Sequence, residues 1–404
     1  MSKTLILIPA GFPYGKSETF LETEILYLSE AFEEVTILCP KPKDTNVREL
    51  PSNCKVDFYT KELTPIDKVK SLGGLFSSST WKEIKIISKT YKPKVSKGIL
   101  STLLISLYQA KRLAQLCHRN YLYDQKPQNE TVFYSYWCDD TALSLALLKQ
   151  EYPRLKCVSR MHRWDIYFEE SEVNYLPFRT DIANQLNQII SISQDGIDYA
   201  VQTWKVNKDC FTLSRLGVKG STPVIPKDNI LKMVSCSNLI PVKRVHLIAE
   251  ALVQIEDINI EWTHFGDGRL FDEFKKLVKK LPKNIKVNHP GRVLNQEVYE
   301  AYQKIQPHLF INVSSSEGVP VSIMEAMSFG IPCIATDVGG NREIVNNENG
   351  VLLSANPSLE AIQTAIKSCL NDESKRKAAY ETWEKEYNAE KNYREFVNQL
   401  LNLK

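Results

Sequence analysis

Strand-like and helix-like segments alternate along this chain, and the alternation limits the folds that it can adopt. Short apolar runs predict strands in the N-terminal half, and amphipathic stretches between them predict helices. The expected strands are 4–10, 34–40, 131–137, 156–162, 188–193 and 210–218, with helices at 18–32 and 140–152 among the segments between them. Strands that alternate with helices form parallel, doubly wound sheets, because each crossover helix returns the chain to the same edge.

The same alternation starts again after residues 217–229, a stretch of Gly, Ser and Pro that predicts a linker. A chain of 404 residues is also too long for one ordinary core. We therefore expect an α/β fold with two Rossmann-like, doubly wound parallel-sheet domains facing a central cleft. The expected parts are an N-terminal domain at 1–220, a C-terminal domain at 221–385, and a terminal helix at 386–404 that crosses back to the first domain.

Composition excludes several other classes of protein. Hydrophobic residues make up 43% and charged residues 25%, as in globular proteins, and no apolar run reaches the roughly 18 residues of a membrane span. The N-terminus resembles a first strand more than a signal peptide, so we expect a cytoplasmic protein. The nine cysteines lack C-x-x-C spacing, and Asp139 and Asp140 open a predicted helix, so we expect neither a metal site nor a cofactor.

Positive charge is concentrated in one segment although the net charge is only +3. Residues 68–119 hold eleven Lys and Arg but one acid, Glu83, and they also carry apolar faces. A solvated helical face and a surface that binds anions explain the positive charge equally well. We expect helices here that contact the anionic inner face of the cell membrane peripherally. No motif supports nucleic-acid binding.

The segment "SSSEGVPVSIMEAMSFGIP" (314–332) places one acid before a predicted helix and another inside it. Pro320 suits an early helix position, and Gly330 followed by Pro332 ends the helix. Glu317 and Glu325 are then too far apart for the carboxylate pair of a glycoside hydrolase, which needs about 5 to 9 Å.

A ligand with a diphosphate between two sugars fits this segment better. Helix N-termini offer N–H groups and a positive dipole end to phosphates. Carboxylates on either side can accept hydrogen bonds from vicinal hydroxyls, so the segment favours a nucleotide sugar. The residues expected around its phosphates are Gly318, Val319, Pro320, Val321 and Ser322.

At this point a resemblance to a known family becomes specific. "EGVPVSIMEAM" resembles the E-x7-E motif of the retaining glycosyltransferases of family four, which have the GT-B fold. The resemblance implies that Glu317 holds hydroxyls of the donor sugar and that Glu325 binds the ribose. Alone the motif is weak, but the strand, Gly, Pro and helix around it are all in place.

A second segment, 235–252, resembles the family's strand–loop–helix motif G-R-L-x-x-x-K-G. The resemblance puts Lys243 at the diphosphate-binding lysine, where a cation neutralises charge on the leaving group. The chain departs from the motif twice: Asn238 stands at the usual Arg position and Arg244 at the Gly position. Whether Arg244 replaces the missing charge stays open, and both residues remain in the expected donor site.

Weaker matches extend the resemblance to other loops. Segment 264–274 resembles the G-x-G-P-L loop, which implies a donor role for Gly266, although an ordinary turn is nearly as good an explanation. Segment 289–302 resembles the part of the family whose backbone frames the nucleobase, which implies Gly291, Arg292 and Val293 as lining.

In the N-terminal half, "CVSRMHRWDIYFEE" (157–170) resembles the strand that ends in a His near the reaction centre. The resemblance makes His162 a catalytic candidate together with Lys243 and Glu317, although a lone His is more often structural. The first β–α turn, "PAGFPYGKSETF", contains Gly15, where backbone can approach a phosphate closely, and Lys16 adds charge. A simple turn capped by Ser17 explains this segment equally well.

The resemblance implies a retaining, metal-independent glycosyltransferase. It would move a sugar from a UDP- or GDP-sugar to a glycan or lipid-linked oligosaccharide acceptor in cell-surface polysaccharide biosynthesis. The donor's own phosphate oxygen would help to deprotonate the acceptor, and the protein would supply orientation and electrostatics.

Two alternatives share the architecture, a UDP-sugar 2-epimerase or hydrolase and a non-catalytic nucleotide-sugar binding protein. An NAD-dependent oxidoreductase is excluded, because the first turn lacks G-x-G-x-x-G.

Overall fold

The computed structural model describes residues 3–15, 18–43, 46–91, 95–123, 130–227, 230–369 and 372–403. Within them the chain divides into two compact units. The first unit comprises Met1–Ser214 together with Tyr393–Lys404, and the second comprises Arg215–Asn392. Residues 217–227 of the expected linker lie inside the second unit, where Val218 exchanges backbone hydrogen bonds with Tyr387 and Ala389.

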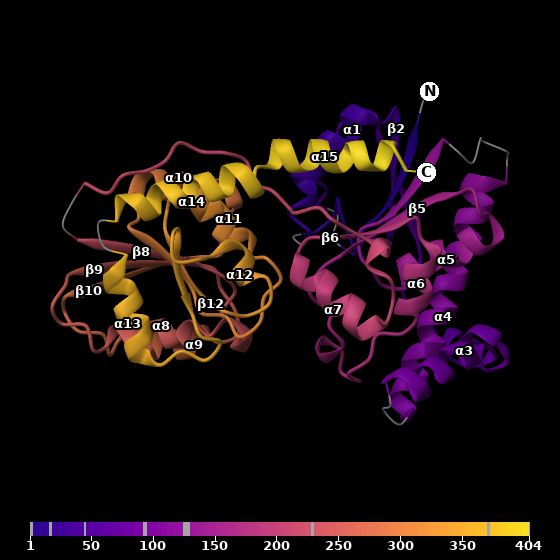
Figure 1. The fold of residues 1–404 in the computed structure, drawn as a ribbon, viewed down its shortest axis with the longest axis horizontal. Coiled ribbons are helices and arrows are strands. Elements are labelled where there is room, and N and C mark those ends of the chain that lie inside the picture. The colour runs from indigo at the N-terminus through magenta and orange to yellow at the C-terminus, as the bar shows by residue number, and fades with distance from the viewer. Residues whose placement is uncertain are drawn as a thin grey trace. The chain divides into compact units, whose positions relative to one another are not determined.

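The first unit is built on a seven-stranded sheet in which every pair of neighbours is parallel (Figure 1). The strand order is β3-β2-β1-β4-β5-β6-β7. The strands are β1 (Thr4–Ile8), β2 (Glu34–Pro40), β3 (Cys54–Tyr59), β4 (Thr131–Ser135), β5 (Lys156–Met161), β6 (Gln188–Ser191) and β7 (Phe211–Leu213).

Helices cover both faces of this sheet, because apolar side chains alternate between the faces along each strand. Leu5 and Leu7 of β1 face α1 and α15, whereas Ile6 and Ile8 face the layer that includes α4 and α5. The helices are α1 (Leu21–Ala31), α2 (Pro65–Ser71), α3 (Ser78–Ile86), α4 (Lys97–Cys117), α5 (Asp140–Glu151), α6 (Arg179–Gln185), α7 (Gln194–Trp204) and α15 (Ala389–Leu401), with short helical segments η1 (Leu72–Phe76), η2 (Ile87–Tyr91), η3 (His118–Leu122), η4 (Phe168–Glu170) and η5 (Lys208–Cys210).

The second unit has a six-stranded parallel sheet of order β10-β9-β8-β11-β12-β13. Figure 1 shows α8, α9 and α13 on one face of it and α10, α11 and α14 on the other. The strands are β8 (Leu231–Cys236), β9 (Ile260–Phe265), β10 (Ile285–Gly291), β11 (Leu309–Asn312), β12 (Cys333–Thr336) and β13 (Gly350–Leu353); the helices are η6 (Pro241–Lys243), α8 (Val245–Leu252), α9 (Phe271–Val278), α10 (Asn295–Ile305), α11 (Val321–Ser328), α12 (Asn341–Ile344), α13 (Leu359–Ser368) and α14 (Glu373–Glu386).

The predicted fold class, two doubly wound parallel sheets, is confirmed. Two edge strands, β3 and β13, escaped the sequence prediction. Residues 54–58 are half-buried or exposed and include Lys55 and Asp57, so they lack the apolar run of a central strand. β13 has only four residues. None of the helices in the described ranges is long and apolar enough to cross a membrane.

A buried ion pair links four elements of the first unit, β4, β5, α1 and α15. The Arg160 guanidinium of β5 lies 3.3 Å from the Glu24 carboxylate of α1, and both side chains are fully buried. Tyr134 donates its hydroxyl to the same carboxylate at 2.9 Å, and the guanidinium lies over the Phe396 ring of α15, 4.2 Å from its centroid. Each charge depends on the other here, because water cannot replace a lost partner.

We expect Arg160→Met to lower the free energy of unfolding of the first unit by about 3 kcal/mol, because Glu24 is then left charged and buried without its cation. The double variant Glu24→Leu/Arg160→Met should recover most of this loss. Denaturant unfolding measures both, and Lys43→Met, which removes one partner of an ion pair that is largely exposed, is the control. An Arg160→Met protein as stable as the native one would contradict the role given to the pair.

Candidate functional site

The candidate site of the second unit lies where the strand order of its sheet reverses. β8 is flanked by β9 on one side and β11 on the other, so the loops after β8 and β11 leave the sheet in opposite directions. Open parallel sheets bind ligands at such a switch point, outside the carboxyl ends of the strands. Lys243 lies in the loop after β8 and Glu317 in the loop after β11.

Lys243 and Glu317 meet in this position. The lysine Nζ lies 2.6 Å from Glu317 Oε1, which also accepts the Asn312 side-chain amide at 3.1 Å. Glu317 is 7% exposed, and the Lys243 side chain is 23% exposed. The Ser315 N–H donates to the carbonyl of Val242 at 2.8 Å and ties the two loops together. The ammonium group has three donors, and Glu317 is its one hydrogen-bond partner among the described residues, so two donors remain for a ligand.

A pair of glycines supports the loop that carries Glu317. A Cβ atom on Gly339 would lie 2.0 Å from the Glu317 carbonyl oxygen, and its φ of +50° also favours glycine. The Gly340 N–H donates to the carbonyl of Gly318 at 2.9 Å. Only residues without side chains allow this approach, so the sequence "VGG" after β12 sets the position of the acidic loop.

The helix expected after Glu317 is confirmed as α11. Pro320 is its N-cap residue and Val321 and Ser322 open it, while Gly318 and Val319 lead into it from the loop. Helices leave their first N–H groups without acceptors of their own, so this end can receive an anion. Gly330, with a φ of +67°, follows the helix as predicted.

Glu325 lies inside α11, and its environment disfavours ionisation. It is 7% exposed, and the Asn295 side chain donates to its Oε1. Burial raises the pKa of Glu325 to about 7, and the hydrogen bond from Asn295 offsets part of the rise. The Tyr302 hydroxyl is buried nearby without a hydrogen-bond partner in the described ranges. Glu325 therefore exchanges a proton near neutral pH.

The structure uses Arg244 to hold backbone. Its guanidinium donates to the carbonyls of Val313, Ser314 and Ala355 at 2.7, 2.8 and 2.8 Å, and to the Asn356 side chain at 3.0 Å. These bonds clamp the start of the acidic loop to the segment after β13. Asn238 is exposed in the loop after β8. The contact of Arg244 with the nucleotide sugar stays a prediction.

Gly266, which follows β9, and Gly291, which ends β10, bring three loops together. Gly266, with a φ of +127°, packs so closely that a Cβ atom would lie 2.0 Å from the carbonyl oxygen of Ser237, and its N–H donates to Gly291 at 2.8 Å. Arg292 and Val293 follow Gly291, the arginine exposed and the valine half-buried. These residues therefore lie beside the loop after β8, and their contact with a nucleobase stays a prediction.

In the first unit, His162 follows β5 and is buried among aromatic rings. The rings of Trp137 and Tyr136 lie 4.4 and 4.8 Å from it, centroid to centroid. Neither ring nitrogen has a hydrogen-bond partner in the described part of the chain. Burial, and then the charge of Arg160, lower the pKa of His162 well below its usual value. The imidazole is thus neutral, with two unused polar atoms.

The first β–α turn holds an anion from its own chain. The Glu18 carboxylate accepts the N–H groups of Ala10, Gly11 and Phe12 at 2.9, 2.8 and 2.8 Å, and the Trp137 indole N–H at 2.7 Å. These amides are therefore already used. Gly15 has a φ of +71° and no atom within 4 Å of a notional Cβ. Lys16 and Ser17 lie outside the described residues.

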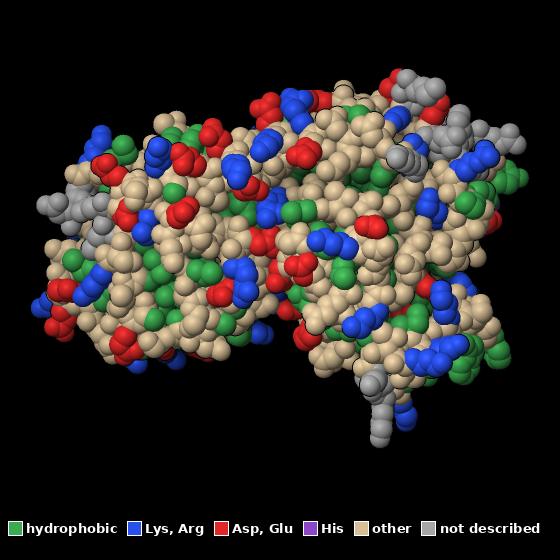
Figure 2. Space-filling model, viewed as in Figure 1, with side chains coloured by type: hydrophobic (Ala, Val, Ile, Leu, Met, Phe, Trp, Pro, Cys, Tyr) green, Lys and Arg blue, Asp and Glu red, His purple; other side chains and the backbone are tan. Residues whose placement is uncertain are grey.

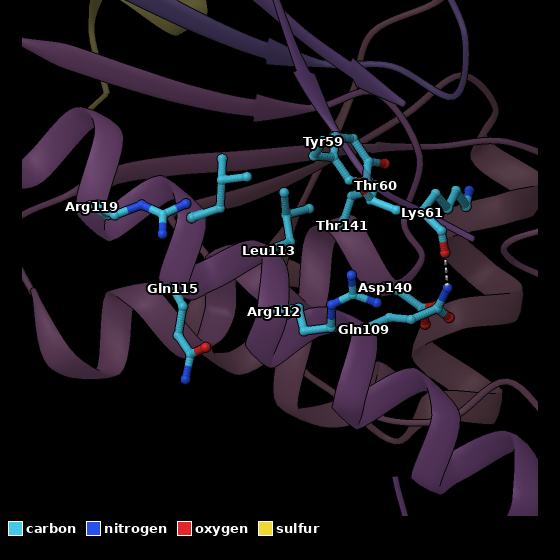
Figure 3. Close-up of a pocket in the computed structure, with 11 residues that line it drawn as sticks. Tyr59, Thr60, Lys61, Gln109, Arg112, Leu113, Gln115, Arg119, Asp140 and Thr141 are labelled. Atoms are coloured by element: carbon cyan, nitrogen blue, oxygen red, sulfur yellow. Dashed lines mark hydrogen bonds between the residues drawn. The ribbon is translucent and has the colours of Figure 1, made fainter. Parts of the chain in front are cut away.

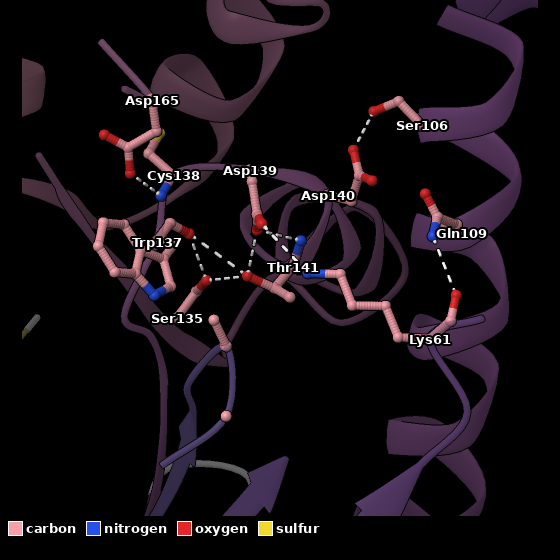
Figure 4. Close-up of polar contacts among 12 residues, drawn as sticks. Lys61, Ser106, Gln109, Ser135, Trp137, Cys138, Asp139, Asp140, Thr141 and Asp165 are labelled. Atoms are coloured by element: carbon pink, nitrogen blue, oxygen red, sulfur yellow. Dashed lines mark hydrogen bonds and ion pairs between the residues drawn. The ribbon is translucent and has the colours of Figure 1, made fainter. Parts of the chain in front are cut away.

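The predicted role of Asp139 and Asp140 at a helix start agrees with the structure. Asp139 caps α5 by accepting the Thr141 N–H at 2.9 Å, and Asp140 accepts the Ser106 hydroxyl (Figure 4). Among the described residues, Asp139 and Asp140 included, no three His, Cys, Asp or Glu side chains converge on a point where they could hold a metal ion.

Sequence reasoning missed five residues that shape the site. Asn312 ends an apolar strand, Gly339 and Gly340 form a doublet after another, and both features are signals that could have been used. Asn295, in contrast, begins a helix in the ordinary way, and only the fold brings it to Glu325. Glu18 follows a turn, and only its positive φ of 57° and the fold direct its carboxylate toward the N–H groups of residues 10–12.

Comparison with known proteins places this geometry in context. Residues 223–386 match the family described as "Glycosyl transferases group 1". The N-acetyl-alpha-D-glucosaminyl L-malate synthase of Bacillus anthracis is 24% identical over 277 residues, 65% of this chain and 70% of that protein. The O-antigen biosynthesis glycosyltransferase WbnH of Escherichia coli is 24% identical over 210 residues, 49% and 56% of the two chains.

Solved structures show the same fold over the whole chain. The crystal structure of Anabaena HepE in complex with UDP superposes with a TM-score of 0.67 and 17% sequence identity, and covers 99% of this chain and 100% of that one. The likeness extends through both parallel sheets, and it concerns the fold.

We expect the stability of the second unit to depend on pH through Glu325. Its pKa is about 7 in the folded protein and 4.5 ordinarily, so the native state binds the proton more tightly. The stability due to the protonated group is complete below pH 4.5 and is lost as pH rises through 7. Relative to Glu325→Gln, the native protein should lose about 2 kcal/mol between roughly pH 5 and 8.

Denaturant unfolding across this pH range measures the difference. Glu384→Gln, which replaces an exposed acid of α14, should follow the native profile. Parallel profiles of the native protein and Glu325→Gln would show that Glu325 ionises normally.

Proposed function

We propose that the protein transfers a sugar from a nucleotide diphosphate sugar to a hydroxyl of a glycan or lipid-linked acceptor, on the premise that residues 223–386 match the group 1 glycosyl transferases. The observation that carries the proposal is the convergence of Lys243, Glu317 and Asn312 at the switch point of the second sheet. A half-buried cation near a helix N-terminus suits a diphosphate that must leave with its charge neutralised.

The donor is assigned to the loops after β8 and β11 and to α11. Lys243 uses the two free donors of its ammonium group on diphosphate oxygens, and the first N–H groups of α11 add further donors. Glu317 is held by Lys243 and Asn312, so its remaining oxygen faces the sugar hydroxyls in a fixed orientation. Glu325 accepts from the ribose hydroxyls in its ionised form, so donor binding should lower its pKa.

The chemistry we propose is retaining and independent of metal. The diphosphate leaves toward Lys243 while its oxygen takes the proton of the acceptor hydroxyl, so that no protein carboxylate forms a covalent bond. His162 acts as a neutral hydrogen-bonding group at the sugar, because its lowered pKa keeps it from donating a proton as an acid. Support for the acceptor class comes from relatives such as WbnH of Escherichia coli, an O-antigen biosynthesis glycosyltransferase.

An exposed apolar stripe in the first unit supports a peripheral membrane contact. The stripe consists of Ile66 and Val69 of α2 and Leu72 and Phe76 of η1, which follow one another at helical spacing.

 Ile66 and Val69 are each 66% exposed, Leu72 is 52% exposed and Phe76 is 93% exposed. Lysines 68 and 70 flank the stripe on α2, and Figure 2 shows hydrophobic and basic side chains together in the lower right of the view, over α3 and its neighbours. Such a face suits an anionic lipid surface.

We expect Lys243→Gln to lower the turnover number by a factor of about 100 to 1000, because the amide keeps a donor for Glu317 but cannot neutralise the leaving diphosphate. Product formation from a panel of UDP- and GDP-sugars measures this and also identifies the base. Thermal unfolding should be unchanged, and Lys280→Met, at an exposed position in the same unit, is the control. Native turnover in Lys243→Gln would remove the role given to this lysine.

We expect the double variant Val69→Ser/Phe76→Ser to bind vesicles of phosphatidylcholine and phosphatidylglycerol at least about tenfold more weakly, because burying two such side chains contributes about 1.5 to 3 kcal/mol each. Vesicle co-sedimentation measures the partition. Ile225→Ser, which removes an equally exposed side chain of the second unit, should bind as the native protein does. Negligible binding of the native protein to both neutral and anionic vesicles would end the membrane proposal.

A further inference from the structure

The lining of a pocket in the first unit includes neither His162 nor Glu18. The volume of the pocket is about 280 Å³. It is lined by the end of β3 and the two residues after it, by one side of α4 with Arg119 beyond it, and by the start of α5. Figure 3 shows Arg112 between Arg119 on one side and Asp140 and Lys61 on the other. The pocket therefore opens at the carboxyl end of β3, an edge where parallel sheets offer ligands their loops.

Local structure explains why these residues meet. β3 ends at Tyr59, so Thr60 and Lys61 leave the sheet at this edge, and the Gln109 side chain donates to the Lys61 carbonyl at 3.2 Å. That bond fixes the segment after β3 against α4. The first turn of α5 closes another side of the pocket and directs its positive dipole end toward it.

Three cations of the lining have only weak partners. Arg112 lies 3.8 Å from an Asp67 oxygen and Lys61 lies 4.0 Å from an Asp139 oxygen, both beyond hydrogen-bonding distance. Arg119 donates only to the Asn120 side chain, at 3.4 Å, among the described residues. The one acid of the lining, Asp140, already accepts from Ser106. Most of the positive charge in the pocket therefore remains available to a ligand.

A buried hydroxyl gives an independent indication of a ligand. Tyr59 lines the pocket and is 9% exposed, yet its hydroxyl has no hydrogen-bond partner in the described ranges. An unpartnered buried hydroxyl is unfavourable in a folded protein, so such groups usually serve a ligand or water.

We propose that this pocket binds a phosphate group carried by the acceptor, with Lys61, Arg112 and Arg119 as its cationic partners and Tyr59 as a neutral donor. The inference rests on the proposed transfer function and adds the chemical class of the acceptor. Two guanidinium groups suit phosphate, because each presents parallel N–H donors to two oxygens. Leu113 and Leu116 of α4 complete the lining with apolar surface for the rest of the molecule.

The pocket also adjoins the helix that carries the exposed apolar stripe. Asp67 of α2 accepts the Tyr108 hydroxyl of α4 at 2.8 Å, and it is the same acid that lies near Arg112. A phosphate at a lipid surface held by α2 would thus lie close to the three cations. A lipid-borne diphosphate and a water-soluble sugar phosphate share this chemistry, and the experiment separates them.

Titration calorimetry with inorganic pyrophosphate tests the site in the full-length protein. The donor site can also take pyrophosphate, so each variant is made in both the native and the Lys243→Gln background. In both backgrounds, Arg112→Gln/Arg119→Gln should weaken binding at least about tenfold, since both guanidinium groups lose their charged hydrogen bonds to phosphate oxygens. Tyr59→Phe should weaken binding by a smaller factor, and Arg154→Gln, at an exposed position of the same unit, should not.

Two results would overturn the proposal: pyrophosphate binding that disappears entirely in Lys243→Gln, or binding that is unchanged in Arg112→Gln/Arg119→Gln. UDP binding, measured in the same proteins, should be unaffected by the pocket variants. If no nucleotide or nucleotide sugar binds to the native protein, the proposed function fails, whereas the pocket is judged by pyrophosphate alone.

Vesicles identify the source of the phosphate. Phosphatidylcholine vesicles containing a polyprenyl diphosphate are compared with vesicles of equal charge that contain phosphatidylglycerol. Stronger co-sedimentation with the diphosphate vesicles, lost in Arg112→Gln/Arg119→Gln, supports a lipid-borne acceptor. Equal co-sedimentation together with pocket-dependent pyrophosphate binding supports a soluble phosphate-bearing acceptor.

Discussion

Parallel pairing of all strands is the constraint on which the rest of this structure depends. In a parallel sheet every strand ends at the same edge, so the loops after the strands collect there. The order of the second sheet reverses between β8 and β11, and this brings Lys243 and Glu317 within 2.6 Å although 74 residues separate them. The first sheet reverses between β1 and β4, beside the turn that contains Glu18.

Burial then determines what the charged groups can do. Glu325 ionises near neutral pH because α11 places it out of water with one amide partner, Asn295. Glu317 accepts hydrogen bonds from Lys243 and from the Asn312 side-chain amide. Two carboxylates of one motif thus receive different chemistry from their surroundings. His162 is neutral for the same reason, since aromatic rings and a buried arginine both oppose its charge.

The first unit combines three features that suit an acceptor held at a surface. The exposed stripe on α2 and η1, the lysines beside it and the cationic pocket between β3, α4 and α5 are linked through Asp67. Each feature alone has an ordinary explanation as a solvated helix face or a packing defect. Their connection through one side chain is what makes a phosphate-bearing acceptor the economical interpretation.

The sequence by itself determined the two parallel sheets, because apolar periodicity and Gly or Pro punctuation are local properties of the chain. It also indicated the helix after Glu317. Only the tertiary structure decided that Arg244 clamps backbone, that Glu18 fills the first turn, that Asn295 reaches Glu325 and that the cations of the pocket converge. Those outcomes depend on desolvation and on contacts between residues far apart in the chain, and no local pattern encodes them.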